Sequence, residues 1–126
     1  MKHRWAAFLL AALLVMLSAI AGCVPSAPIN TLWFTTSNSG REVSVWKMGE
    51  PFTFGQQNLS VYVDGEEVYQ TYIANDGAVL FYTNYSATWE SSSLLVLVFK
   101  GDEQKDEILY VHLDGDTISV ESNRIY

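Results

Sequence analysis

The residue best suited to covalent chemistry is Cys23, the only cysteine of this 126-residue chain. An ionised thiol is a strong nucleophile, far stronger than a serine hydroxyl. Cys23 follows two small residues, Ala21 and Gly22, and before these an uncharged, mostly apolar run extends over residues 5–20. Residues 1–4 contain a lysine and an arginine. A short basic start followed by such a run is typical of an export signal.

The segment Ile20-Ala21-Gly22-Cys23 resembles the lipobox of bacterial lipoproteins, with a branched aliphatic residue three places before the cysteine. The resemblance implies a thioether between Cys23 and diacylglycerol, cleavage between Gly22 and Cys23, and a lipid-anchored product. Two or three acyl chains would hold the protein on a membrane, since each buried methylene contributes about 0.8 kcal/mol. The next residue is Val24 rather than Asp, and the family rule then points to the outer membrane of an organism that has one.

Two other interpretations of the start stay open. One is an uncleaved transmembrane anchor in which Cys23 is incidental, and the other is ordinary secretion by a different cut. A spanning helix needs about 20 apolar residues. No charge follows the apolar run until Arg41, so the basic flank of a stop-transfer segment is missing. The lipoprotein interpretation is favoured, with a signal peptide over 1–22, a proline-containing tether over 23–30 and a domain over 31–126.

The charge of the predicted mature chain, residues 23–126, is strongly negative. It holds five basic residues against all fourteen acidic ones, a formal charge of −9 at pH 7. A negative surface repels nucleic acid, so no nucleic-acid partner is expected. The charge suits a cationic protein partner, or it serves solubility alone.

Residue types for other chemistry are few. His112 is the only histidine of the mature chain, and one histidine without cysteine makes a poor transition-metal site. The chain has no Gly-x-Ser-x-Gly motif, and Ser91-Ser92-Ser93 is typical of a turn. We therefore predict no catalytic residues, no metal site and no cofactor.

Carboxylates are the one abundant reactive group. A pair of them could support glycoside hydrolysis, and Asp102-Glu103 or Asp114-Gly115-Asp116 could bind calcium weakly, although neither has the ligand spacing of an EF-hand loop. Most of the acidic residues fall in predicted turns or loops or directly beside them: Asp64, Glu66, Glu67, Asp76, Asp102, Glu103, Asp106, Asp114 and Asp116. Their positions favour turn geometry and solvation over catalysis.

Tyrosines are the other group with functional potential. Tyrosine is enriched in binding surfaces because it brings contact area at low entropic cost. Ordinary strand composition explains the same enrichment and is favoured. The tyrosines concerned are Tyr62, Tyr69, Tyr72, Tyr82, Tyr85 and Tyr110.

Strands must position these side chains, because β-branched and aromatic residues dominate from Thr31 onward and turn signals recur about every ten residues. Alternation places Val43 and Val45 on one face and Ser44 and Trp46 on the other. It also places Leu59, Val61 and Val63 on one face. The predicted strands span 31–36, 42–47, 58–63, 66–73, 78–82, 94–99 and the two arms of a hairpin over 109–120, with an uncertain one at 87–89. The fold class is all-β, an antiparallel meander of about eight short strands closed as a small barrel or sandwich.

The turns are predicted from Asp-Gly pairs, the strongest short signal for a hairpin. They lie at Asp64-Gly65, Asp76-Gly77 and Asp114-Gly115. A turn centred on Asp114-Gly115 would pair Val111 with Ile118 and Leu109 with Val120, and it would leave His112 exposed beside Thr117. Leu109, Val111, Leu113, Ile118 and Val120 then share one face.

Together these features predict a lipid-anchored, non-enzymatic protein of the bacterial envelope that binds a protein or a glycan. Two alternatives remain. The chain could be an accessory structural subunit of an envelope complex, which would cover one face of the apolar strands 78–82 and 94–99. It could also be a small carboxylate-based hydrolase.

Overall fold

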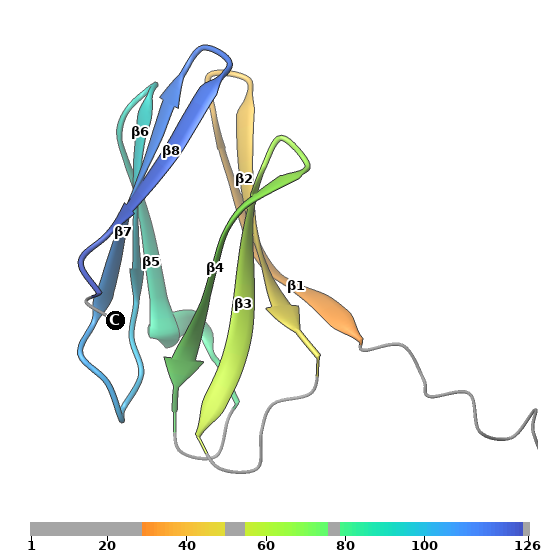
Figure 1. Ribbon diagram of the computed structural model, residues 1–126, viewed down its shortest axis with the longest axis vertical. Coiled ribbons are helices and arrows are strands. Elements are labelled where there is room, and N and C mark those ends of the chain that lie inside the picture. The colour runs from red at the N-terminus through yellow and green to blue at the C-terminus, as the bar shows by residue number, and fades with distance from the viewer. Residues whose placement is uncertain (1–28, 50–54, 76–78, 125–126) are drawn as a thin grey trace, which may run out of the picture.

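The computed structural model describes residues 29–49, 55–75 and 79–124, which form two four-stranded antiparallel sheets (Figure 1). Each sheet is an up-and-down meander, with its strands side by side in chain order. The first sheet contains β1 (Asn30–Asn38), β2 (Arg41–Met48), β3 (Gln56–Val63) and β4 (Glu66–Ala74). The second contains β5 (Tyr85–Ser91), β6 (Leu94–Phe99), β7 (Glu107–Asp114) and β8 (Thr117–Ser122). The predicted all-β meander is confirmed.

The predicted lipobox, including Gly22 and Cys23, lies outside the described residues. Within the described ranges, no helix is long and apolar enough to cross a membrane.

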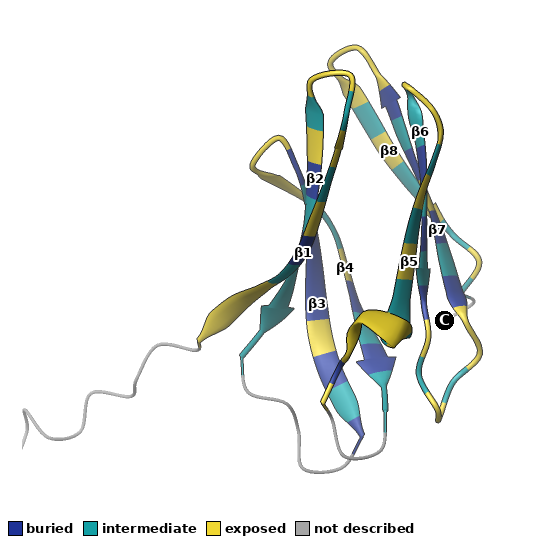
Figure 2. Ribbon diagram, turned by 180° about the vertical axis from the view of Figure 1, so that it is seen from behind, coloured by how far each residue is buried: buried dark blue, intermediate teal, exposed yellow. Residues whose placement is uncertain are grey.

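The two sheets face each other across one core, so the molecule is a sandwich (Figure 2). Side chains alternate between the faces of a strand, and the apolar set of each strand therefore points inward. The predicted inner residues Val43, Val45 and Val61 are fully buried. The second sheet contributes alternate residues of β6 and β7 to the same core: Leu95, Leu97, Phe99, Leu109, Val111 and Leu113.

The β3–β4 turn has the predicted form. Asp64 and Gly65 have φ angles of 50° and 86°, and Val63 pairs with Glu66 across the turn. Positive φ at both central residues is the type I′ geometry, whose twist matches that of the flanking strands.

The register of the last hairpin differs from the prediction. Asp114 pairs with Thr117, so the central residues of the turn are Gly115 and Asp116. When the centre of the turn moves by one residue, the partner of each strand residue changes by two positions. The same side chains therefore stay on the same face of the hairpin. Val111 thus pairs with Val120, Leu113 with Ile118, Leu109 with Ser122 and His112 with Ser119. The apolar face is as predicted, but the predicted pairs and the position of His112 beside Thr117 were wrong.

The predicted strand at 78–82 is absent from its described part. Residues 79–81 have no strand pairing and lead into a short 3-10 helix, η1 (Tyr82–Asn84). Only Leu80 is buried there. This segment connects β4 to β5 and hence one sheet to the other. The predicted turn at Asp76-Gly77 lies outside the described residues. The uncertain strand near 87–89 is real, and it extends over all of β5.

Both open edges of the sandwich are bridged between the sheets. On one side the Phe34 ring stacks on Tyr85 with 3.7 Å between centroids, and Trp89 Nε1 donates to Thr36 Oγ1 at 2.9 Å. On the other side β4 contacts β7 and β8 through a polar cluster around Glu107. These bridges fix how the two sheets face each other.

Candidate functional site

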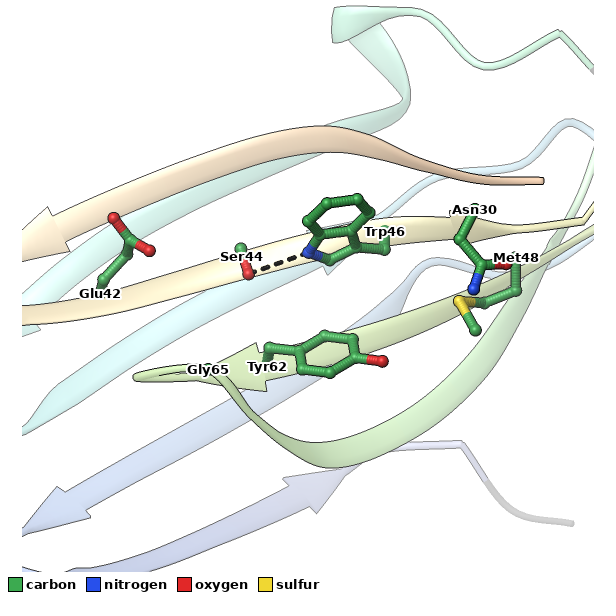
Figure 3. Close-up of a pocket in the computed structure, with 7 residues that line it drawn as sticks. All are labelled: Asn30, Glu42, Ser44, Trp46, Met48, Tyr62 and Gly65. Carbon is green, nitrogen blue, oxygen red and sulfur yellow. Dashed lines mark hydrogen bonds between the residues drawn. The ribbon is translucent and has the colours of Figure 1, made fainter.

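The outer face of the first sheet carries a hollow of about 390 Å³ (Figure 3). It lies over β2 and its neighbours, on the side of the sheet that faces away from the core. Its lining residues are Asn30, Glu42, Ser44, Trp46, Met48, Tyr62 and Gly65.

Strand alternation and register bring this lining together. Because Val43 and Val45 point into the core, Glu42, Ser44 and Trp46 must point outward. The β2–β3 pairing then sets Tyr62 opposite Ser44. The sequence predicted the outward position of Trp46, but it could not predict the pairing that places Tyr62 beside it.

Two aromatic rings form the apolar part of the hollow. The Trp46 and Tyr62 rings lie 6.4 Å apart between centroids at 68°, an edge-to-face arrangement. Trp46 Nε1 donates to Ser44 Oγ at 3.2 Å, which fixes the indole. Both rings are only half-buried and remain accessible to a ligand.

The surroundings of the rings are negative. Glu42 is the only charged residue among the seven that line the hollow. Next to Tyr62, Glu67 accepts hydrogen bonds from Ser60 Oγ at 3.1 Å, the Tyr62 hydroxyl at 3.2 Å and Gln70 Nε2 at 2.6 Å. Partial desolvation of the hydroxyl, its hydrogen bond to Glu67 and the negative charge of that residue raise the pKa of Tyr62. Aromatic faces beside carboxylates can bind a cation, and the rings alone can pack against an apolar ligand surface.

The nearest arginine is already occupied at the end of the sandwich. Arg41 Nε contacts Asp64 Oδ2 at 2.6 Å, and Arg41 Nη1 donates to the Gly115 carbonyl at 2.7 Å. Arg41 therefore ties the β3–β4 turn of one sheet to the β7–β8 turn of the other. The backbone N–H of Glu42 and the Arg41 guanidinium lower the pKa of Asp64.

A second cavity of about 500 Å³ lies at the edge formed by β4 and β8, where Glu107 and Arg124 are among the lining residues. Glu107 is fully buried and 3.4 Å from Arg124 Nη1. Its carboxylate also accepts from Ser122 Oγ at 2.9 Å, the Tyr69 hydroxyl at 3.2 Å and Thr71 Oγ1. A buried carboxylate on β7 with donors from β4, from β8 and from Arg124 stabilises the sandwich.

Sequence reasoning missed Glu107, although a signal was present. Glu107 continues the alternation of Leu109, Val111 and Leu113 toward the N-terminus, so it occupies an inward position of β7. A charge at an inward position predicts a buried, paired carboxylate.

The other predicted residues do not assemble into a catalytic or metal centre where the structure describes them. His112 is half-buried rather than exposed, with Nε2 4.0 Å from Glu121 Oε1. Ser91 and Ser93 bond each other within a turn, as predicted. Among the described residues, no three His, Cys, Asp or Glu side chains gather as metal ligands.

Comparison with known proteins gives no relative from which a site could be transferred: no family model, no curated protein and no solved structure matches this chain.

Proposed function

We propose that this chain is a lipid-anchored, non-enzymatic protein of the bacterial envelope that binds a basic segment of a partner protein in the Trp46–Tyr62 hollow. The lipobox-like residues Ile20 to Cys23 support the anchor, and Val24 after the cysteine supports a position on the outer membrane, where one exists. The aromatic hollow with its neighbouring carboxylates supports the binding role.

The single observation that carries the choice of partner is the chemistry of the hollow. Lysine and arginine side chains bind over aromatic faces, most strongly over Trp, and gain further from a nearby carboxylate. Glu42 lies at the hollow, Glu67 holds the Tyr62 hydroxyl, and no lining residue is basic. The formal charge of −9 on residues 23–126 would also speed the approach of a cationic partner.

Binding of a fluorescent tetra-arginine peptide to the full-length protein in detergent micelles tests this proposal. We expect Trp46→Ala to weaken binding by about tenfold or more, in line with the loss of an aromatic anchor. Tyr110→Ala is the matched control, because Tyr110 is an exposed aromatic residue of the second sheet. Equal affinities of the two variants would contradict the proposal.

A glycan is the second candidate ligand, since the two rings could pack on sugar rings. Glu42→Gln separates the candidates, because it removes the charge while leaving the aromatic rings in place. A neutral oligosaccharide should bind that variant unchanged, whereas the tetra-arginine peptide should lose affinity. Binding of the oligosaccharide with no binding of the peptide would replace the protein partner by a glycan.

One observation favours the accessory-subunit alternative. Leu94, Val96 and Val98 point away from the core of the sandwich and are only half-buried, so β6 presents an apolar strip on the outer face of the second sheet. Sedimentation of the detergent-solubilised protein tests this role: a monomer that stays dispersed at high concentration would argue against an obligate subunit.

A further inference from the structure

Exposed apolar side chains are concentrated in two short segments of the described chain. One is the start of β1, where Ile29 is 64% and Leu32 45% exposed. The other is the connection between the sheets, where Val79, Phe81 and Tyr82 are 58%, 60% and 81% exposed. Elsewhere in the described ranges only one large apolar residue, Tyr110, is exposed.

These two segments lie toward the same end of the molecule. The Trp33 ring contacts the Tyr85 ring at 4.9 Å between centroids, which joins the beginning of β1 to the beginning of β5. Leu32 and η1 immediately precede these two rings in the chain. In Figures 1 and 2 both segments lie in the lower half of the sandwich, away from the β1–β2 and β7–β8 turns at the top. We call Ile29, Leu32, Val79, Phe81 and Tyr82 the apolar end.

The apolar end is also the part closest in sequence to the predicted lipid. Six residues, 24–29, separate Cys23 from β1. Even a fully extended chain covers at most about 3.6 Å per residue, so these six reach no more than roughly 22 Å. A lipid on Cys23 would therefore keep the apolar end close to the bilayer surface whatever path the tether takes.

The two segments of the apolar end are themselves uncharged. Residues 29–32 and 79–84 contain no charged side chain, in a domain that is otherwise strongly acidic. The acidic β6–β7 loop lies at the same end, where the Asp102 N–H donates to Asn75 Oδ1 and Asn75 Nδ2 donates to the Val79 carbonyl. Burial of the apolar side chains, rather than charge, therefore favours the contact with the membrane. Phe and Tyr gain from such a position, because aromatic rings favour the boundary between headgroups and acyl chains.

We propose that the apolar end rests in the headgroup region of the membrane that holds Cys23 and thereby orients the sandwich. This inference depends on the lipid anchor proposed above, but not on the ligand of the hollow. The bound orientation turns the β1–β2 and β7–β8 turns away from the membrane. The hollow, which lies on the flank of the first sheet, stays open to a partner.

The lone cysteine makes the test direct. In the lipidated protein Cys23 carries the acyl chains, so Phe81→Cys provides one free thiol for an environment-sensitive fluorophore. The control is Ser92→Cys, in the exposed β5–β6 turn at the other end of the sandwich. Both full-length proteins are placed in vesicles of phosphatidylethanolamine and phosphatidylglycerol, with or without spin-labelled quencher lipid. We expect quenching at position 81 to exceed that at position 92 at least threefold.

Each outcome has one meaning. Equal quenching at the two positions, with fatty acid present on Cys23 by mass spectrometry, would overturn the docking and leave the anchor intact. Absence of fatty acid would overturn the anchor, and the docking with it. The fluorophore at position 81 could instead show an emission blue shift that grows with protein concentration, without quenching by the spin-labelled lipid. That result would assign the apolar end to contact with a second copy of the chain. Tyr82→Cys repeats the measurement should the change at Phe81 prevent folding.

Discussion

At the scale of single residues, the two most constrained charges in the described chain are Glu107 and Asp64, and they act at opposite ends of the sandwich. Glu107 is buried between the sheets and accepts hydrogen bonds from side chains of two strands, β4 and β8. Asp64 is exposed in a turn, where it binds Arg41 and the Glu42 backbone. Burial decides how strongly each of them affects stability.

Replacing Glu107 should be severely destabilising. Glu107→Ala leaves Arg124 as a nearly buried cation without its counter-ion and deprives Thr71 and Ser122 of their acceptor. Breaking a buried pair in this way costs about 3–5 kcal/mol. Urea unfolding measures the loss, and Glu121→Ala, an exposed carboxylate on β8, is the control expected to change stability by less than about 0.5 kcal/mol. Similar losses for both variants would show that Glu107 is not buried as described.

Asp64 should give the stability of the protein a pH dependence on the acid side. Its pKa is lowered in the folded protein, first by the Glu42 N–H and then by Arg41, from an ordinary value of about 3.9. The folded state therefore binds this proton less readily than the unfolded state. The contribution is fully present above about pH 4 and is lost as the pH falls through the folded pKa.

The Asp64→Asn variant reads out this contribution. Its unfolding free energy should lie below that of the wild type at pH 7, and the difference should shrink as the pH falls below about 4. Urea unfolding across that range measures it. A difference that does not depend on pH would mean that the Asp64 charge does not stabilise the fold.

At the scale of elements, alternation along a strand determines which side chains are buried, and the turn determines which pairs meet. The last hairpin separates the two effects. Its apolar face agrees with the alternation of Leu109, Val111 and Leu113, while its pairs follow the Gly115-Asp116 turn. The face was predictable because a two-residue change of register preserves it.

Two substitutions on β7 test this face. Val111→Asp should unfold the protein, because position 111 is fully buried and the new carboxylate would have no partner there. Burying one unpaired polar group costs about 2–7 kcal/mol. His112→Ala should cost less than about 1 kcal/mol, since its ring lies half-buried on the other face. Thermal unfolding followed by circular dichroism compares them. Comparable loss from both would place β7 in a different orientation.

At the scale of the whole molecule, the two ends of the sandwich differ in chemistry. One end carries the turns that Arg41 connects, and the other carries the apolar end next to the predicted anchor. Under the docking proposed above, this polarity would give the lipidated protein a defined orientation relative to the membrane.

The anchor itself is tested by Cys23→Ser. A hydroxyl is far less nucleophilic than a thiolate, so the variant should take up no lipid and escape the lipoprotein-specific cut. The precursor should keep residues 1–22 and run larger on a gel, and radiolabelled fatty acid should enter only the wild type. If neither form is labelled and both run at the same size, residues 5–22 act as an uncleaved anchor or a signal of another kind.

The sequence by itself determined the strand class, the inward face of most strands and the Asp64-Gly65 turn. These features depend on residues close together in the chain, through alternation and through the positive φ that the turn requires. Ser44 and Trp46 could be placed on the outer face for the same reason. The predicted anchor at Cys23 also comes from local sequence alone.

Only the tertiary structure decided which outer residues meet and which donors surround the buried charge. Trp46 and Tyr62 form a hollow because β2 and β3 pair in one register, and Glu107 is satisfied by donors up to 38 residues away. The apolar segment at 79–81 resembled a strand in sequence, yet the passage between sheets leaves only Leu80 in the core. Contacts between distant strands determine all three, and no local pattern encodes such contacts, because pairing and packing depend on the position of the whole sheet.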